Sequence, residues 1–375
     1  MPNEFQLLIK PVSADCNQEC RYCFYRRVGA LYPSETPHRM SGETLEAMIR
    51  RYLGLRLPES VFCWQGGEPT LAGLDFYRQA VRLMQRHGRD GQPVGNALQT
   101  NGLLLDEDWC RFLAEYRFLV GLSLDGPKEI HDAYRGINGS SYDQVLRAMA
   151  QLRSHQVEFN VLSVVTDLAA RSAKLIYRHF REMGIAHMQF IPCIEVDSGR
   201  RPAEFSVSPE AYGDFLCELF DEWMAEETGR VSERLFDALL AREIHGRSGL
   251  CLLDGGCGNY FVVEYNGDAY PCDFFVAEEW RLGNVRKTSF EKLRERSRAR
   301  EFRSARRDLP EACSACPWQT LCTGGCLKDR QRAGERMDVP TYFCKAYQRL
   351  FSHTADPIRR RAAEIRACAG ALHVP

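Results

Sequence analysis

The residues with the clearest chemical potential are three cysteines near the N-terminus. They follow the spacing Cys16-x3-Cys20-x2-Cys23 in the segment DCNQECRYCFY. Three thiolates at this spacing can hold three irons of a [4Fe–4S] cluster and leave the fourth iron open to bind and reduce a ligand. Zinc is the alternative, because short cysteine spacings also suit it. A structural zinc site needs four ligands and no fourth Cys or His follows closely, so we favour iron–sulfur.

A second set of eight cysteines lies in the C-terminal part of the chain. Its members are Cys251, Cys257, Cys272, Cys313, Cys316, Cys322, Cys326 and Cys344. Eight thiolates are the number that two fully ligated [4Fe–4S] clusters require. Two structural zinc ions, each bound by four thiolates, are the alternative. Spacing alone does not assign these ligands to clusters, because chains often cross between neighbouring sites.

Composition and charge exclude several classes of protein. The chain has 375 residues, of which 45% are hydrophobic, and its net charge of −1 gives no electrostatic basis for binding nucleic acid or an anionic membrane. It has no stretch of about twenty apolar residues, and its N-terminus lacks the pattern of a secretory signal peptide. Sixteen cysteines in such a chain indicate metal thiolates rather than disulfides. We therefore expect a cytoplasmic, reducing location.

Apolar runs rich in β-formers alternate with amphipathic patterns along the first half of the chain. The expected strands are 5–10, 61–65, 97–100, 119–124, 159–165 and 187–191. The expected helices are 42–53, 74–87, 106–116, 142–155 and 172–183. Strand then helix, repeated about six times, predicts parallel βα units, and six units are fewer than a full eight-stranded barrel needs. We predict an α/β fold with a partial (β/α)6 TIM-like barrel.

The pattern changes after the sixth strand. We expect helices at 209–226 and 231–245, and then a β-hairpin that turns at Asn266-Gly267. A cysteine-rich region should follow and fold around metal rather than around a large apolar core. The expected domains are the barrel over 1–235, the cysteine-rich domain with its hairpin and short helices over 236–348, and a helical tail over 349–375. The basic run 291–307 is expected to be a solvated helix face rather than a binding patch.

Polar residues gather where the expected strands end. The second strand ends in Gln65-Gly66-Gly67-Glu68, and the fourth contains Ser123. The two glycines let backbone approach a ligand closely, and the carboxylate of Glu68 suits an ammonium group. The hydroxyl of Ser123 suits a ribose. Ordinary turn chemistry explains any one of these motifs alone, but their occurrence at successive strand ends, where functional groups of parallel βα folds lie, favours a ligand site.

These motifs together resemble the radical S-adenosylmethionine (SAM) enzymes, through Cys16, Cys20 and Cys23. The eight-cysteine pattern resembles their SPASM branch. Within that branch the chain is most similar to the anaerobic sulfatase-maturating enzymes. The similarity is carried by LLIKPVSADCNQECRYCFY, WQGGEPTLAGLDFY, LQTNGLLLDEDW, FLVGLSLDGPKEIHD, AYPCDFFV and WRLGNV, and it spans residues 5–350.

The resemblance implies a reaction. A reduced cluster passes an electron into SAM, and the 5′-deoxyadenosyl radical that forms takes a hydrogen from Cβ of a Ser or Cys in a sulfatase polypeptide. Loss of a proton and a second electron gives an aldehyde, or a thioaldehyde that water hydrolyses. The product is Cα-formylglycine. The cofactor performs the difficult step, while the protein positions it and excludes competing reactions.

The resemblance also implies roles for particular residues. Cys16, Cys20 and Cys23 hold the catalytic cluster, and Asp273 is the general base. The residues that face SAM or the substrate are Tyr22, Tyr25, Gln65, Gly66, Gly67, Glu68 and Ser123. One auxiliary cluster takes Cys251, Cys257, Cys272 and Cys326, and the other takes Cys313, Cys316, Cys322 and Cys344. The implied cofactors are therefore SAM and three [4Fe–4S] clusters. The linker 195–203 shows little similarity, so substrate contacts there stay open.

The implied partners are a sulfatase polypeptide with a Cys/Ser-x-Pro-x-Arg motif and a low-potential electron donor such as flavodoxin or ferredoxin. Two alternatives are open. The first is another SPASM enzyme that forms thioether or carbon–carbon crosslinks in a precursor peptide; such enzymes often carry an N-terminal peptide-binding domain, for which we expect no room before Phe5. The second is a non-catalytic iron–sulfur electron carrier or zinc-held binding module, which leaves the missing fourth N-terminal ligand unexplained.

Overall fold

The computed structural model describes residues 5–136, 140–196, 201–226, 229–331 and 337–371. Its chain divides into two compact units, each built from segments that are not contiguous in sequence. The first unit comprises Met1–Leu124, His131–Asn160 and Cys257–Ser304, and the second comprises Asp125–Ile130, Val161–Gly256 and Ala305–Pro375. The division at residues 235/236 and 348/349 that we expected stays a prediction.

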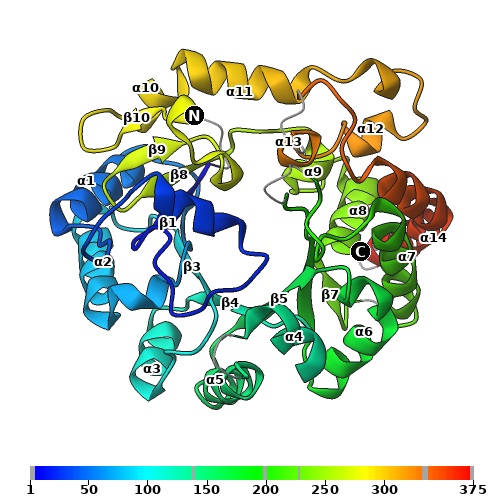
Figure 1. Cartoon of the computed structure of the whole chain (residues 1–375), viewed down its shortest axis with the longest axis horizontal. Helices are drawn as coiled ribbons and strands as arrows, with labels where there is room; N and C mark the ends of the chain where they lie inside the picture. Colours follow the sequence, from blue (N-terminus) through cyan, green and yellow to red (C-terminus); the bar gives the residue numbers. More distant parts are fainter. Residues whose placement is uncertain (1–4, 137–139, 197–200, 227–228, 332–336, 372–375) are drawn as a thin grey trace. The chain divides into compact units, whose positions relative to one another are not determined.

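The first unit contains a mostly parallel sheet with an antiparallel edge. Its strands are β1 (Gln6–Lys10), β2 (Ser60–Trp64), β3 (Val94–Thr100), β4 (Leu119–Ser123), β8 (Tyr260–Glu264), β9 (Asp268–Tyr270) and β10 (Gly283–Asn284). Strands β1 to β4 pair in parallel in sequence order. Strand β8 pairs in parallel with the free side of β1, and β9 and β10 follow as antiparallel neighbours. The predicted hairpin is therefore confirmed, and it extends the barrel sheet (Figure 1).

The helices of the first unit agree closely with the predicted ones. They are α1 (Gly42–Leu53), α2 (Leu74–His87), α3 (Glu107–Glu115), α5 (Tyr142–Ser154) and α10 (Phe290–Arg294), with the 3₁₀ helices η1 (Phe24–Ala30), η2 (Pro69–Ala72), η4 (Asp273–Phe275) and η5 (Glu278–Trp280). Capping side chains fix where two of them begin. The Ser41 side chain accepts a hydrogen bond from the Thr44 amide, and that of Asp106 accepts one from the Trp109 amide. Helices α1 and α2 lie on the outer side of the strands (Figure 1).

Aromatic residues form much of the core between this sheet and its helices. The rings of Tyr52 and Phe62 meet edge to face at 5.0 Å, and those of Trp64 and Tyr77 at 5.3 Å. Phe5 packs edge to face on Phe261, 5.1 Å away, where β8 joins β1. Such pairs add about 0.5–1.5 kcal/mol each beyond the area that they bury. This packing holds the strand ends, and therefore the site, on a rigid base.

The second unit contains the remaining barrel strands and most of the helical mass. Strands β5 (Phe159–Val165), β6 (His187–Pro192) and β7 (Ser232–Glu233) pair in parallel in sequence order, and the first two residues of β5 belong to the first unit. The helices are η3 (Ala169–Arg171), α6 (Ala173–Glu182), α7 (Pro209–Met224), α8 (Arg234–His245), α9 (Cys251–Asp254), η6 (Glu311–Cys313), α12 (Gln319–Cys322), α13 (Leu327–Arg330) and α14 (Cys344–Ala371). The predicted tail helix is part of α14, which begins earlier, at Cys344, and packs on α7 and α8.

Two helices, α4 (Lys128–Arg135) and α11 (Ser297–Arg307), contain residues of both units, and each differs in part from what the sequence predicted. Helix α4 was not predicted. The basic run forms α10 and α11, and Arg296, Arg298, Arg300 and Arg307 are exposed, as expected of a solvated face. Arg306 departs from that expectation because it is fully buried. Within the described ranges, no helix is long and apolar enough to cross a membrane.

Candidate active site and cluster sites

The three N-terminal cysteines lie in the loop that follows β1. Cys16 is exposed, Cys20 is buried and Cys23 is half-buried. The loop closes through a hydrogen bond from the Cys23 amide to the Cys20 carbonyl at 3.1 Å. The side-chain amide of Asn101, at the end of β3, donates to Asn17 Oδ1 at 2.8 Å and lies 4.0 Å from Cys16 Sγ. The structure therefore places the first cysteine set beside the neighbouring strand ends, as predicted for a parallel sheet.

The glycines at the end of β2 pack directly against this cysteine loop. Gly66 and Gly67 have φ of +95° and +46°. A Cβ at Gly67 would lie 2.0 Å from the Asp15 carbonyl oxygen, and one at Gly66 would lie 2.3 Å from Lys10 Cδ. The Glu68 amide donates to the same Asp15 carbonyl at 2.8 Å. Only glycine allows this close approach, which positions the residue that precedes Cys16.

The carboxylate of Glu68 is fully buried and has protein partners. Its Oε1 accepts from the Thr70 amide at 3.0 Å, the Thr70 hydroxyl at 2.6 Å and the Thr100 hydroxyl at 2.7 Å. Its Oε2 accepts from the Asn101 amide at 2.8 Å. Burial raises the pKa of Glu68, and these donors oppose that effect. Glu68 thus joins the ends of β2 and β3, and its contact with an ammonium group stays a prediction.

A histidine that sequence analysis did not single out also holds the cysteine loop. His38 Nδ1 lies 2.8 Å from Asp15 Oδ1, and its Nε2 lies 2.7 Å from the Tyr32 carbonyl oxygen. Both partners accept hydrogen bonds, and the imidazole can donate from both ring nitrogens only when it is protonated. Burial lowers the pKa of His38, but the bonds to Asp15 and Tyr32 outweigh burial and raise it above the ordinary value. No local sequence signal marks this residue.

The other predicted SAM contacts lie in the first unit near the strand ends. Tyr22 is buried and packs edge to face on Tyr134 at 6.5 Å, with the Arg135 guanidinium 5.4 Å from its ring. The Ser123 hydroxyl accepts from the Gln99 side chain at 3.1 Å. The Gln65 amide donates to the Ile9 carbonyl at 2.9 Å, which ties β2 to β1. Their roles toward a ligand stay predictions.

A buried polar group around Tyr25 joins the ends of β1 and β8. The Tyr25 hydroxyl donates to Glu264 Oε1, and Lys10 Nζ lies 4.3 Å from the centre of the Tyr25 ring. Lys10 and Glu264 are register partners on the two strands. Among the described residues, Lys10 Nζ and Glu264 Oε2 have no hydrogen-bond partner. Burial lowers the pKa of Lys10, while Asp273, Glu264 and two cysteines act in the opposite direction. Lys10 and Glu264 were not predicted; a charged residue at the end of an apolar run is the signal that marks them.

Asp273 lies beside Cys272, and a tyrosine bridges both. The Tyr260 hydroxyl donates to Asp273 Oδ1 at 3.1 Å and lies 2.9 Å from Cys272 Sγ. Cys272 Sγ lies 3.5 Å from the same Asp273 oxygen. Asp273 is buried, and its charge acts on Lys10. A carboxylate so placed can take a proton next to a cluster ligand.

The remaining predicted cluster ligands fall into two groups. The set Cys251, Cys257, Cys272 and Cys326 is divided, because Cys257 and Cys272 belong to the first unit and Cys251 and Cys326 to the second. Its assembly around one cluster stays a prediction. The set Cys313, Cys316, Cys322 and Cys344 belongs wholly to the second unit.

One cavity of about 160 Å³ is lined by all four of these cysteines, Cys313, Cys316, Cys322 and Cys344. Trp318, Tyr347 and Phe351 also line it. Burial raises the pKa of Cys322 to about 11 and also raises those of Cys313 and Cys344. In the part of the chain that the structure describes, no three Cys, His, Asp or Glu side chains lie close enough to bind a single metal ion. Four thiols that line one cavity are the donor set of a fully ligated [4Fe–4S] cluster.

Known proteins similar to this chain decide its family. The profile of the radical SAM superfamily matches residues 11–167, and that of an iron–sulfur cluster-binding SPASM domain matches residues 255–317. The cysteine-type anaerobic sulfatase-maturating enzyme of Clostridium perfringens is 39% identical over 92% of this chain and 95% of its own. The serine-type enzyme of Bacteroides thetaiotaomicron is 36% identical over 93% and 89%.

This chain belongs to the anaerobic sulfatase-maturating enzymes. Solved structures agree with that family. Native anSMEcpe with bound AdoMet and Cp18Cys peptide has a TM-score of 0.89 and 38% identity, over 96% of this chain and 99% of its own. Streptococcus suis SuiB bound to S-adenosylmethionine is 16% identical with a TM-score of 0.63, which shows a shared fold alone. The predicted α/β radical SAM fold with a SPASM hairpin is confirmed for this sulfatase-maturating enzyme.

Proposed function

We propose that this sulfatase-maturating enzyme oxidises Cβ of a Cys or Ser in a sulfatase polypeptide to give Cα-formylglycine. The observation that carries this proposal is the likeness to a relative solved with AdoMet and a peptide, which extends over 96% of this chain. The predicted catalytic elements, from the cysteine loop to Asp273, all fall within the first unit. An electron carrier would need neither a three-thiol loop nor a buried carboxylate beside a cluster ligand.

SAM would bind beside the cysteine loop. Cys16, Cys20 and Cys23 would hold three irons of a [4Fe–4S] cluster, which supplies the electron that cleaves SAM when both are bound. The loop is fixed against Gly67 and His38, so the three thiols meet the cluster from a defined backbone. Tyr22 would pack on the adenine, and Ser123 would contact the ribose.

Asp273 would take the proton that the substrate loses. Tyr260 donates to its Oδ1 at 3.1 Å, which fixes the orientation of the carboxylate beside Cys272. Position next to Cys272 would let proton and electron leave the substrate at neighbouring points. A positioned base of this kind contributes about 10²–10⁴-fold to a rate.

Two auxiliary clusters complete the proposed set of three. Cys313, Cys316, Cys322 and Cys344 would hold one of them, and the shared cavity supports this assignment. Cys251, Cys257, Cys272 and Cys326 would hold the other, as the family resemblance implies. A low-potential donor such as flavodoxin or ferredoxin would reduce the enzyme, and the target would carry Cys/Ser-x-Pro-x-Arg.

The proposal is tested by anaerobic incubation with SAM, dithionite and one of two matched peptides, which carry Cys-x-Pro-x-Arg or Ser-x-Pro-x-Arg. We expect an aldehyde at the target residue of at least one peptide, detected by mass spectrometry, together with 5′-deoxyadenosine. A peptide with Ala at the target position is the control. SAM cleavage without aldehyde on either peptide would favour another SPASM modifying enzyme. No SAM cleavage, with zinc bound in place of iron, would favour the binding module.

A further inference from the structure

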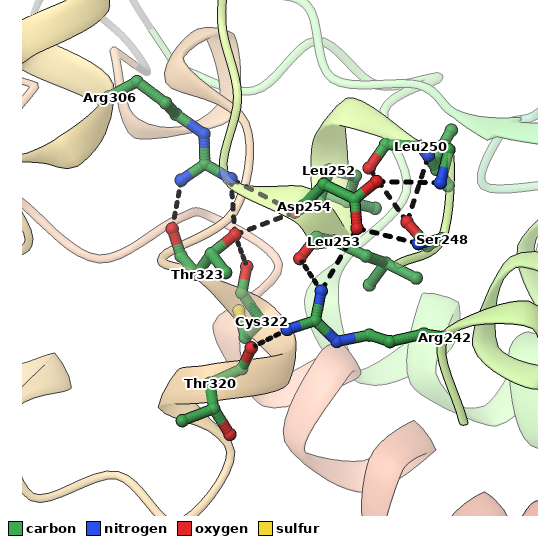
Figure 2. Close-up of polar contacts among 11 residues, drawn as sticks. Arg242, Ser248, Leu250, Leu252, Leu253, Asp254, Arg306, Thr320, Cys322 and Thr323 are labelled. Atoms are coloured by element: carbon green, nitrogen blue, oxygen red, sulfur yellow. Dashed lines mark hydrogen bonds and ion pairs between the residues drawn. The ribbon is translucent and has the colours of Figure 1, made fainter. Parts of the chain in front are cut away.

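Arg306, in the last turn of α11, is buried and has no charged partner among the described residues. Its side chain is 1% exposed. The guanidinium donates to the Thr323 carbonyl, to the Thr323 hydroxyl at 2.8 Å and to the Leu252 carbonyl at 3.1 Å (Figure 2). All three acceptors are neutral. No ion pair joins Arg306 to a carboxylate within the ranges that the structure describes.

A buried charge of this kind destabilises the protein unless a negative group balances it, and no carboxylate does so for Arg306 among the described residues. A guanidinium does not lose its proton inside a protein, so it cannot become neutral as a buried lysine can. An unpaired charge that is removed from water destabilises the folded protein strongly. The hydrogen bonds of Arg306 go to neutral acceptors, so they leave its charge uncompensated.

One of the four cysteines that line the cavity is joined to Arg306 through the backbone next to it. Thr323, which Arg306 holds, directly follows Cys322. The Thr323 hydroxyl, which accepts from Arg306, lies 2.8 Å from the Cys322 carbonyl oxygen. Cys322 and Gly324, on either side of Thr323, line the cavity described above. The positive charge therefore lies beside the wall of the predicted cluster site.

A second buried arginine holds the same backbone. Arg330 donates from Nε to the Gly324 carbonyl at 2.8 Å and from Nη1 to the Asp308 carbonyl at 3.1 Å. Two guanidiniums thus bind the segment Thr323–Gly324 between Cys322 and Cys326.

Arg242 provides a contrast in the same neighbourhood (Figure 2). It donates to the Thr320 carbonyl at 2.6 Å and to the Leu253 carbonyl at 2.9 Å, so it also ties α8 to α9 and α12. Unlike Arg306, it is only half-buried and pairs with the carboxylate of Asp254 at 3.1 Å. Its charge is therefore already balanced by the protein.

We propose that Arg306 is the counter-charge of the auxiliary [4Fe–4S] cluster held by Cys313, Cys316, Cys322 and Cys344, and that it raises the reduction potential of that cluster. This inference rests on the ligand set of the proposed function. A cluster with four thiolates is anionic, and reduction adds a further negative charge. A fixed positive charge stabilises the reduced form more than the oxidised form, because the attraction grows with the charge. Net charge and hydrogen bonding around a cluster are known to set its potential.

The test uses the full-length chain with Cys16, Cys20 and Cys23 replaced by Ala, so that bound iron belongs to the auxiliary clusters. After anaerobic loading with iron and sulfide, both reduction potentials are measured by titration followed by electron paramagnetic resonance. In Arg306→Gln we expect one potential to fall, with at least a tenfold loss in the ratio of reduced to oxidised cluster at fixed potential, which is about 59 mV for one electron. Arg306→Lys keeps the charge and should stay near the parent value. Arg242→Gln is the matched control and should change neither potential.

Loss of the cavity cluster in Arg306→Gln but not in Arg306→Lys would also support the proposal, because the charge alone separates the two variants. Unchanged potentials in Arg306→Gln would overturn it. Equal loss of iron from both variants would overturn it as well, because the guanidinium would then act only as a scaffold. The parent's iron and sulfide content tests the ligand set separately, and aldehyde formation by the unmodified chain tests the proposed function. Failure of either is therefore distinguishable from failure of the inference.

Discussion

The Tyr260 hydroxyl donates to Asp273 Oδ1 at 3.1 Å and lies 2.9 Å from Cys272 Sγ. One phenol thus contacts both the proposed base and a predicted cluster ligand. The two residues come from different parts of the SPASM hairpin region, since Tyr260 begins β8 and Asp273 begins η4. The proposed function places proton transfer and electron transfer at the two groups that this phenol contacts.

Asp273→Asn should separate SAM cleavage from product formation. The amide keeps the size of the side chain but cannot accept a proton, so we expect 5′-deoxyadenosine to form while aldehyde yield falls by about 10²–10⁴-fold. Both products are measured in one anaerobic reaction by mass spectrometry. Asp268→Asn, at a buried aspartate of the same hairpin bonded to Asn266 and Asn284, is the control and should keep its aldehyde yield. An unchanged yield in Asp273→Asn would remove Asp273 as the base.

Tyr25→Phe should destabilise the fold. It removes the donor to Glu264 Oε1 and leaves a second oxygen of that buried carboxylate without a partner. We expect a loss of about 1–3 kcal/mol in the free energy of unfolding, measured by denaturant titration of the cluster-free chain. Tyr116→Phe, at a half-exposed tyrosine, should change the value by less than about 0.5 kcal/mol. Equal effects of the two substitutions would argue against the buried bond.

Gly67→Ala should prevent loading of the catalytic cluster. The new Cβ would lie 2.0 Å from the Asp15 carbonyl oxygen, so the cysteine loop must move. Gly73→Ala is the matched control, since Gly73 also has a positive φ but no atom within 4 Å of the added Cβ. Iron analysis and electron paramagnetic resonance should show loss of the SAM-responsive signal in Gly67→Ala only. Retention of that signal would show that the loop tolerates displacement.

The stabilisation of the cysteine loop by the hydrogen bonds of His38 should weaken as pH rises. The folded-state pKa of His38 is raised above its unfolded value, so its stabilising contribution is complete below about pH 6.5 and is lost as pH rises through the folded pKa. The neutral ring can donate to only one of Asp15 and Tyr32.

The rate at which a chelator removes iron measures how firmly the cysteine loop holds the cluster. We expect the difference in release rate between the wild type and His38→Gln to be largest at pH 6 and to shrink toward pH 9, because the glutamine side chain of the variant does not titrate in this range. Comparison at each pH cancels the chelator's own pH dependence. A constant difference across this range would contradict a charged His38.

Local patterns predicted most of the elements, and long-range pairing accounts for what they missed. Alternation and turn chemistry gave β5 and the Asn266-Gly267 hairpin, since both depend on neighbouring residues. The parallel pairing of β8 with β1 joins segments about 250 residues apart along the chain, so nothing local announces that Lys10 and Glu264 meet. The charge pattern predicted that Arg306 would be exposed. That prediction was wrong because the burial of one arginine in a basic helix depends on the segments that pack against it. The cysteine spacing alone did not predict which four thiols share a cavity. The family resemblance supplied that assignment.

Transfer of deuterium tests the central claim most directly. A target peptide with both Cβ hydrogens of its reactive Cys or Ser replaced by deuterium is incubated anaerobically with the reduced enzyme and SAM. We expect one deuterium in each 5′-deoxyadenosine formed with turnover, matched by one aldehyde that retains the other deuterium. Formation of 5′-deoxyadenosine without deuterium, or of aldehyde without 5′-deoxyadenosine, would contradict radical oxidation at Cβ.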